Sequence, residues 1–551
     1  MSDDAVQVVA YDVPMRDGVR LPVDVYRSTP ERTPAILLRT PYDRRFLPHR
    51  LFELDPLALA RGGFAVAIQD VRGRFAAEGT WEPLVPDAQD GADAVAWLRA
   101  QPWCDGRVVT AGNSYSGCVQ FRLAQARPEG LLAVAPTVGG AFADVLRPGG
   151  ALRLCAIDMF VGWAMLDALA GELPAAERAE LEQLLDGSPL ERFHAFLEPG
   201  SLAARMGEPV RRWLDPPQSD PYWTTVTAVP ERPLPAIHTT GCYDSCASAA
   251  VAAHAVWSAA ADEQCPQLLT LGPWEHQLYV TVAPVLGLDD PRVPGADFAH
   301  ARQRAFFESV MRGEPGSGMA PVMSYVLGRN RWHEDTQWPP RGVRSVALSL
   351  VHAAEGGALA REATGPPAPC RYRYDPRDPV PTFGGAHAMW RVTGPFEQAA
   401  VEARADVLCF TSGAFDAELE IAGEPVAHLV VGSSAPATDF VVKLCAVLPD
   451  GRSIALVNGN WSGRLADLPA AADASLRRCS IRLGPIHVAL APGTRLRLQV
   501  TSSSYPDLYP NPNTGHDLRL GPPPSVAVAE QTVLAGAGAS TLELPVLGAL
   551  R

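Results

Sequence analysis

The stretch VVTAGNSYSGCVQF, residues 108–121, places a serine between small residues directly after an apolar run. Gly112 and Ser116 stand two positions before and after Ser114, and a helical pattern follows. A serine exposed at a strained strand-to-helix turn requires small neighbours of this kind. A plain turn serine would use the same residue types, but the preceding strand and the following helix favour a nucleophile at Ser114.

The segments around this turn alternate between apolar strands and helical patterns. Strands are predicted at 34–40, 63–70, 107–111 and 131–138, and helices at 87–100 and 118–126. Such alternation is typical of a mostly parallel sheet with helices on both faces. The first part of the chain is therefore predicted to be an α/β domain.

The pattern of hydrophobic and turn-forming residues changes three times further along the chain. From 145 to 233 the pattern is helical, and from 234 to 343 strand-like segments return. After a break at 332–342, residues 344–551 consist of short alternating strands separated by Gly, Pro and Asn turns. We expect an α/β domain over 1–144 and 234–343, interrupted by a helical insert and followed by an antiparallel β-sandwich.

The composition excludes several classes of partner. The chain has 551 residues, 47% of them hydrophobic, and a net charge of −14. This charge argues against nucleic acid and anionic membranes as partners. The opening MSDDAVQVVAYD lacks the apolar core of a secretory signal, so a cytoplasmic location is expected. Cys242 and Cys246 are the only close cysteine pair, and no Cys/His cluster accompanies them in the sequence; no metal or cofactor is expected.

A nucleophilic serine requires a base, and the base requires an orienting carboxylate. Asp244 follows the predicted strand PAIHTTG, and His276 follows the next one, PQLLTLG. The order Ser114, Asp244, His276, with each residue after a strand, is the order of the triad in α/β hydrolases. His238 and His254 lie within a strand and an alanine-rich helix and are interpreted as core residues.

Attack of a serine on a carbonyl produces an oxyanion, which backbone N–H groups at the start of the following helix can stabilise. In α/β hydrolases a further donor usually lies in the loop after an early strand. The segment AILLRTPYDRR places Tyr42 in that loop. A phenol is a neutral donor at pH 7, but a tyrosine in a proline turn also suits a surface position. The residues alone leave both interpretations of Tyr42 open.

Several motifs together resemble the cocaine esterase-like serine hydrolases, which are related to X-prolyl dipeptidyl peptidases and α-amino acid ester hydrolases. The resemblance covers nearly the whole length. The motifs that carry it include RTPYDRR, AVAIQDVRGRFAAEGTW, AGNSYSG, GCYDSC, LGPWEH, YDPRDPVPTFGG and SSSYPDLYPNPNTG.

This resemblance implies roles for particular residues and domains. Ser114 matches the family's nucleophile, and Asp244 and His276 match the other members of its triad. Tyr42 matches the side-chain oxyanion donor, and the backbone N–H of Tyr115 is the other donor. The family also implies an α/β-hydrolase domain, a helical cap and a C-terminal jelly roll, which correspond to the parts predicted above.

The resemblance is weaker at the acyl pocket. Trp163 is kept, but Ser245-Cys246 stands where glycine and phenylalanine are expected. We predict Trp163, Phe160 and Cys246 as substrate-binding residues, together with Asp158. That carboxylate lies at helical spacing with apolar residues, and either a pocket role or a helix-end role suits it. With one such acid, neutral acyl esters are predicted to be better substrates than α-amino esters.

The leading prediction is a serine hydrolase that cleaves carboxylic esters, with amides as a further substrate class, through an acyl-enzyme on Ser114. One alternative is an acyltransferase of secondary metabolism that uses the same intermediate. A second is an α-amino ester hydrolase or X-Pro peptidase. A non-catalytic binding protein is disfavoured by the intact triad order. The expected partner is a small ester or amide, with a homodimer left open.

Overall fold

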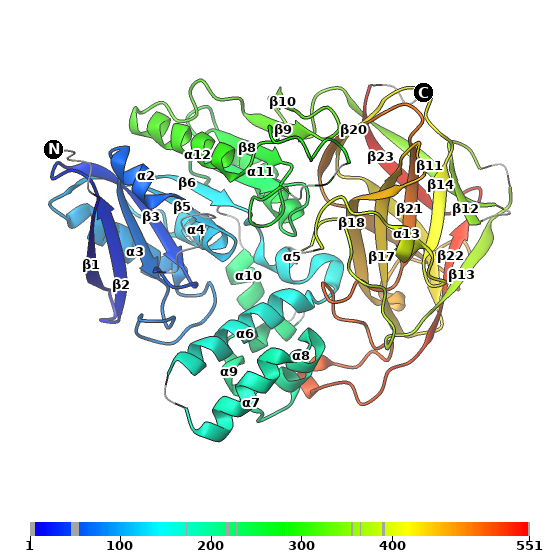
Figure 1. The fold of residues 1–551 in the computed structure, drawn as a ribbon, viewed down its shortest axis with the longest axis horizontal. Coiled ribbons are helices and arrows are strands. Elements are labelled where there is room, and N and C mark those ends of the chain that lie inside the picture. Colours follow the sequence, from blue (N-terminus) through cyan, green and yellow to red (C-terminus); the bar gives the residue numbers. More distant parts are fainter. Residues whose placement is uncertain are drawn as a thin grey trace.

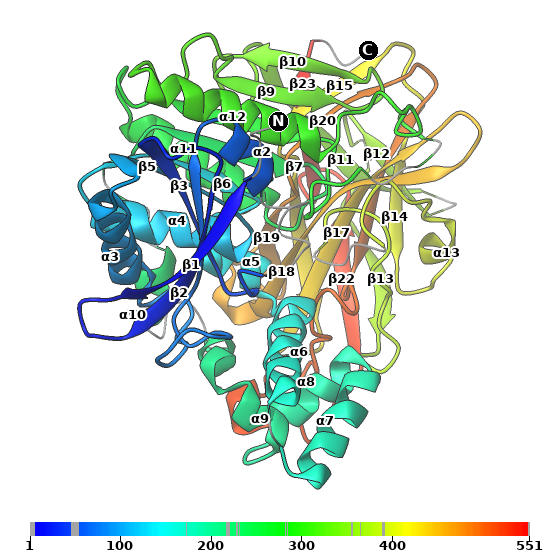
Figure 2. The same cartoon turned by 60° about the vertical axis from the view of Figure 1, so that its left-hand side comes forward.

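The computed structural model describes residues 6–45, 54–171, 173–215, 221–227, 230, 232–280, 283, 285–353, 356–363, 365–387 and 392–548. An α/β part and a β-rich part lie side by side, and a group of helices lies beneath them (Figure 1). Seen from the second direction, these helices project downward from the other two parts (Figure 2).

Within the described residues, one ten-stranded sheet forms the α/β part. Its strands follow the order β1 (Gln7–Pro14), β2 (Arg20–Arg27), β4 (Ala65–Asp70), β3 (Thr33–Thr40), β5 (Cys104–Asn113), β6 (Leu131–Thr137), β7 (Ala236–Gly241), β8 (Gln267–Gly272), β9 (Val322–Val326) and β10 (Arg331–Asp335). Neighbours from β4 to β9 are parallel, and the outer pairs are antiparallel. The predicted mostly parallel sheet is therefore present.

Helices cover both faces of this sheet, and each face has its own core. Along β3, Leu37 packs with α3 (Asp87–Ala100), α4 (Tyr115–Ala126) and α11 (Ala247–Ala260). Ile36 and Leu38 point the other way, toward α2 (Pro56–Arg61) and α12 (Ala296–Met311). Successive strand residues face opposite sides, so a strand buried on both faces is apolar throughout.

Between β6 and β7 the described residues form mostly helices. The helices are α5 (Phe142–Leu146), α6 (Leu154–Ala170), α7 (Ala175–Asp186), α8 (Pro189–Leu197), α9 (Leu202–Met206) and α10 (Pro221–Thr227), with 3₁₀ turns at Pro148–Gly150 and Glu208–Leu214. The sequence sets the start of α8: Ser188 and Glu191 form a reciprocal capping box, and Pro189 occupies the first turn. The first helix begins at Phe142, three residues before the predicted boundary.

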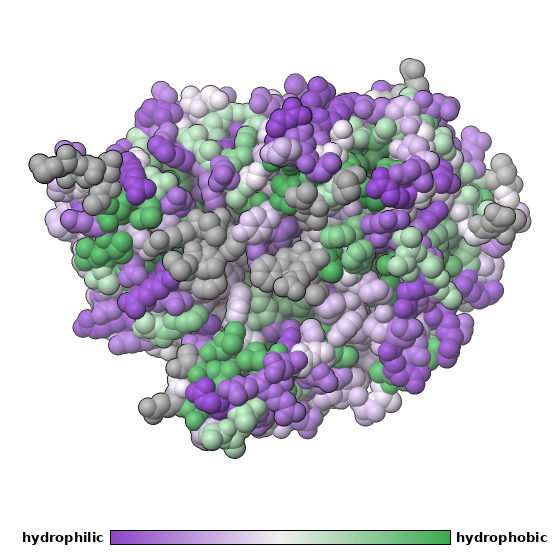
Figure 3. Space-filling view, in the orientation of Figure 1, coloured by the Kyte–Doolittle hydropathy of each residue, from purple (hydrophilic) through white to green (hydrophobic). Residues whose placement is uncertain are grey.

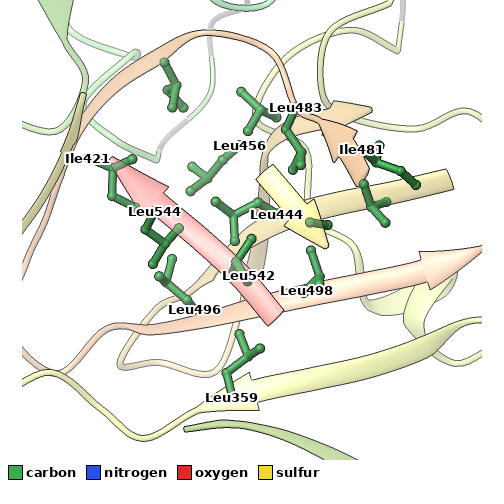
Figure 4. Packing of buried hydrophobic residues seen from close by; sticks show 14 of the residues in the cluster. Leu359, Ile421, Leu444, Leu456, Ile481, Leu483, Leu496, Leu498, Leu542 and Leu544 are labelled. Atoms are coloured by element: carbon green, nitrogen blue, oxygen red, sulfur yellow. The ribbon is translucent and has the colours of Figure 1, made fainter. Parts of the chain in front are cut away.

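The β-rich part contains β11 (Val343–Ala353), β12 (Gly356–Ala360), β13 (Ala368–Tyr374), β14 (Leu408–Ser412), β15 (Leu419–Gly423), β16 (Val426–Ser433), β17 (Ala437–Val447), β18 (Ser453–Arg464), β19 (Arg477–Arg482), β20 (Ile486–Leu490), β21 (Arg495–Thr501), β22 (Ala529–Ala535) and β23 (Thr541–Leu547), with the short helix α13 (Ala399–Glu402). Leucine and isoleucine side chains from many of these strands fill one core (Figure 4). The pairing is antiparallel except between β12 and β14, which run parallel.

The surface is mixed in character. Hydrophilic residues cover much of the face in Figure 3, and hydrophobic residues gather in small areas, one of them over the helical part. In the described part of the chain, no helix has both the length and the apolar character needed to cross a membrane.

Candidate active site

The serine singled out by the sequence lies at a strained turn between β5 and α4. Ser114 has φ 62° and ψ −120°, a conformation that residues with a side chain rarely adopt. A Cβ at Gly112 would lie 2.6 Å from the Cβ of Ser116, and one at Gly117 would lie 2.7 Å from the carbonyl of Thr137. The turn therefore requires glycine at both places, and the strand–turn–helix arrangement predicted for Ser114 is present.

A continuous hydrogen-bonded chain runs from this serine to a buried carboxylate. His276 Nε2 lies 2.9 Å from Ser114 Oγ, and His276 Nδ1 lies 2.7 Å from Asp244 Oδ1. Asp244 follows the end of β7 and His276 follows the end of β8, at the same edge of the parallel sheet as the serine. The structure thus brings His276 together with Ser114, 162 positions earlier, and with Asp244, 32 positions earlier.

Two further donors hold the carboxylate in place. Thr240 Oγ1 donates to Asp244 Oδ2 at 2.7 Å, and the Cys246 backbone N–H donates to Oδ1 at 3.0 Å. Burial alone would lower the pKa of His276, but Cys246 and the negative charge and hydrogen bond of Asp244 raise it, and the net pKa lies well above the ordinary value. The carboxylate of Asp244 therefore favours the charged, imidazolium form of His276.

Tyr42 lies next to the backbone amide of Tyr115, the residue that follows Ser114. Tyr42 follows β3, and its hydroxyl accepts from the Tyr115 backbone N–H at 3.3 Å. The Tyr42 backbone N–H donates to Thr40 Oγ1 at 3.1 Å, which fixes the loop. An oxyanion at this point would receive hydrogen bonds from the phenol and from the amide after the nucleophile. Tyr42 thus lies part-buried next to the amide of Tyr115, and its role as an oxyanion donor stays a prediction.

The other end of Tyr115 is anchored in the interior. Its hydroxyl accepts from the Leu84 backbone N–H at 2.9 Å and lies 3.4 Å from Asp87 Oδ2. Burial, followed by the charge of Asp87, raises the pKa of Tyr115 well above its ordinary value, so the phenol stays neutral. This ring fixes the first residue of α4, and with it the amide that faces Tyr42.

Tyr42 can be tested by removing one atom. Tyr42→Phe is expected to lower kcat by about 10²–10³-fold, because one oxyanion donor contributes this much. KM should change little, since the phenol acts chiefly in the transition state. Steady-state kinetics of ester hydrolysis would measure both values, with Tyr11→Phe on distant β1 as the matched control. A raised KM with unchanged kcat would make Tyr42 a substrate-binding residue instead.

Three of the four predicted pocket residues lie near Tyr42, Tyr115 or His276. The Trp163 ring packs edge-on against Tyr42, with centroids 4.8 Å apart. Phe160 lies deeper, 5.2 Å from the Trp163 ring and 6.0 Å from that of Tyr115. Cys246 Sγ lies 3.8 Å from His276 Nδ1, so its thiol sits on the Asp244 side of the imidazole.

The fourth predicted residue, Asp158, is engaged elsewhere. Both of its carboxylate oxygens accept from Arg192 of α8, from Nε at 2.7 Å and from the second terminal nitrogen at 2.8 Å. The two side chains are 11% and 14% exposed, respectively. The charge of Asp158 is therefore balanced within the helical part by a bidentate ion pair.

The sequence analysis missed a buried ionic network behind the acid loop. Arg153 donates to the Ser245 carbonyl at 3.0 Å and lies 3.6 Å from Asp507. Asp507 also lies 3.1 Å from His387, whose backbone pairs with that of Asp244. Burial raises the pKa of Asp507, but Arg153 and His387 lower it by a larger amount, so the net pKa lies below its usual range. Residues of all three parts of the chain thus support the loop that carries Asp244.

The α/β sheet, the strained serine and the Ser–His–Asp chain define a serine hydrolase. The sequence pattern of the X-Pro dipeptidyl-peptidase (S15) family matches residues 17–278, and that of the X-Pro dipeptidyl-peptidase C-terminal non-catalytic domain matches residues 317–542. Cocaine esterase from Rhodococcus sp. (strain MB1 Bresler) is 32% identical over 539 residues, which cover 91% of this chain and 92% of that protein. The chain belongs to this family of serine ester hydrolases.

Solved structures show the same fold over nearly the whole chain. An aminopeptidase from a marine sediment archaeon, Thaumarchaeota archaeon, has a TM-score of 0.77 at 23% identity and covers 98% of this chain and 97% of its own. An α-amino acid ester hydrolase has a TM-score of 0.76 at 22% identity, with 99% and 97% coverage. These likenesses extend through both the α/β part and the β-rich part.

Proposed function

We propose that this serine hydrolase cleaves esters of neutral carboxylic acids through an acyl-enzyme on Ser114. The observation that carries the proposal is the unbroken chain from Asp244 through His276 to Ser114. Beside that chain, the Tyr42 hydroxyl and the Tyr115 backbone N–H lie 3.3 Å apart, and both would donate to an oxyanion formed there. This combination supplies a nucleophile, its base and an oxyanion site within hydrogen-bond reach of one another.

We propose the following proton movements for two half-reactions. Ser114 Oγ attacks the ester carbonyl while His276 Nε2 takes the hydroxyl proton, and the carbonyl oxygen becomes an oxyanion held by the two donors. Collapse breaks the bond to the leaving alcohol, which receives the proton from His276. Water then attacks the acyl-enzyme with His276 again as base, and the carboxylic acid leaves as Ser114 regains its proton.

We further propose roles for the other parts of the chain. The helical segment 145–233 would act as a cap, with Trp163 and Phe160 forming an apolar wall beside Tyr42. The β-rich segment 344–551 would be a jelly roll that supports the acid loop through Asp507 and His387. All ten cysteines are free thiols, which supports a reducing, cytoplasmic compartment.

The charges near the pocket favour a neutral acyl group. An ammonium group removed from water requires a carboxylate that is free to pair with it. Asp158 is held by Arg192, and Asp167, one turn after Trp163, lies 3.4 Å from Arg74. An aminopeptidase and an α-amino acid ester hydrolase among the solved relatives define the alternative, a substrate that carries an α-amino group.

Two matched substrates test this choice. We expect kcat/KM for a butyryl or phenylacetyl ester to exceed that for an α-amino ester with the same leaving group by about tenfold or more, a difference of about 1.4 kcal/mol. Release of the free acid should be followed directly, so that hydrolysis is separated from acyl transfer. A preference for the amino ester that Asp158→Asn removes would contradict the proposal and assign a cation site to Asp158.

A further inference from the structure

Three potential metal ligands lie together behind the catalytic imidazole. A carboxylate oxygen of Asp244, the sulfur of Cys246 and a ring nitrogen of His276 all lie within 4.8 Å of one another. A thiolate, an imidazole and a carboxylate form a donor set that suits Zn²⁺ and its softer relative Cd²⁺. The sequence did not indicate this cluster, because His276 lies 30 residues after Cys246 and reaches it only through the fold.

We propose that Asp244, Cys246 and His276 form an inhibitory site for a thiophilic divalent cation such as Zn²⁺ or Cd²⁺. The inference rests on the proposed function, since the cation would use two members of the catalytic triad. It adds a way in which the activity could be switched off, and it depends on a cysteine at a position where the resemblance predicts phenylalanine.

The distances are close to those that a tetrahedral cation requires. Zinc bonds of about 2.0–2.3 Å place a sulfur and a nitrogen ligand about 3.6 Å apart, and a nitrogen and an oxygen ligand about 3.3 Å apart. Cys246 Sγ and His276 Nδ1 are 3.8 Å apart, and Nδ1 and Asp244 Oδ1 are 2.7 Å apart. The sulfur is thus already well placed, and the imidazole has to move about 0.6 Å away from the carboxylate to admit the ion.

The surroundings allow this movement. Thr240 holds Asp244 Oδ2, so Oδ1 can exchange one partner for the cation while the loop keeps its shape. Arg153 holds the carbonyl of Ser245 and thereby fixes the backbone next to Cys246. The His276 side chain is 19% exposed, whereas that of Asp244 is fully buried, so the ring is the member of the cluster with access to solvent.

Occupancy would remove the base by changing the tautomer. In the active form, His276 carries its proton on Nδ1, facing Asp244, and Nε2 accepts from Ser114. A cation bound to Nδ1 takes the place of the proton on that nitrogen. The imidazole proton must then reside on Nε2, where it donates to Ser114 Oγ. The Cys246 thiol releases its own proton to solvent as the sulfur–metal bond forms. Ser114 can then no longer be deprotonated by His276.

The first test is inhibition of ester hydrolysis by Zn²⁺ or Cd²⁺ in metal-free buffer, with the purified full-length chain. We expect inhibition that a chelator reverses, and a half-inhibitory concentration at least about tenfold higher in Cys246→Ala. Cys118→Ala, which removes another buried thiol near the nucleophile, should behave like the wild type. Each variant is compared with its own rate without metal, so changes in basal rate do not enter.

The second test does not depend on activity. Co²⁺ bound to the site should produce a thiolate-to-cobalt charge-transfer band in the wild type and in Ser114→Ala, which keeps all three ligands, and no band in Cys246→Ala. A band in inactive Ser114→Ala would support the site even if the proposed substrate were wrong. Absence of the band in folded wild-type and Ser114→Ala protein, or equal metal inhibition of wild type and Cys246→Ala, would overturn the proposal.

Discussion

Replacing Ser114 with alanine is expected to lower kcat for ester hydrolysis by about 10⁶-fold, because members of a triad act as a unit and the acyl-enzyme cannot form without the hydroxyl. The residual rate would come from the oxyanion donors and from substrate binding alone. Steady-state kinetics on the preferred ester would measure the loss, and a covalent serine probe followed by peptide mapping would locate the modified residue.

Ser116→Ala provides the matched control for this prediction. Ser116 lies two residues further along, in the first turn of α4, and is buried. It removes a buried hydroxyl without removing the nucleophile, so the variant should retain covalent labelling and turnover. A Ser114→Ala protein that still reacts with the probe and turns over at a near-native rate would show that another residue is the nucleophile.

The hydrogen-bonded cluster of the three candidate catalytic residues could be predicted because their signals are local. Ser114, Asp244 and His276 each follow a strand whose apolar run is visible in the sequence, and carboxyl ends of parallel strands meet at one edge of the sheet. The predicted strand 34–40 corresponds to β3, and the predicted helix 87–100 has the bounds of α3. His238 and His254 are confirmed as core residues, since they are 0% and 6% exposed. Their burial lowers the pKa of His238 to about 3 and that of His254 to about 4.

Contacts between distant side chains could not be predicted in the same way. Asp158 shows an apolar helical neighbourhood in the sequence, but its partner Arg192 lies on another helix, and no spacing rule connects the two. Arg153 and Asp507 are more than 350 residues apart, and an Arg or Asp at either place is equally typical of a solvated loop. The parallel pair β12/β14 likewise depends on a long connection that strand patterns do not specify.

The second large effect is expected for Asp244→Asn, which should lower kcat by about 10⁴-fold while the fold is retained. Asp244 accepts from three donors: the Thr240 hydroxyl, the Cys246 amide and His276 Nδ1–H. An asparagine has only one acceptor oxygen. If that oxygen stays with Thr240, the NH₂ group faces His276 Nδ1 and donates to it. The imidazole proton must then reside on Nε2, which can no longer accept the proton of Ser114. If the amide is reversed, its NH₂ group faces the Thr240 hydroxyl, which must rotate.

The kinetics of this variant should show a catalytic loss rather than a binding loss. KM should remain near the wild-type value, because Asp244 is fully buried behind the imidazole and does not face the acyl pocket. Asp290→Asn is the matched control, since Asp290 follows His276 in the sequence and, among the described residues, its side chain forms an ion pair with exposed Arg292 two positions away. Circular dichroism would verify the fold of both variants. A kcat of Asp244→Asn within tenfold of the wild type would show that the orientation of His276 does not depend on this carboxylate, and the proposed triad would have to be reassigned.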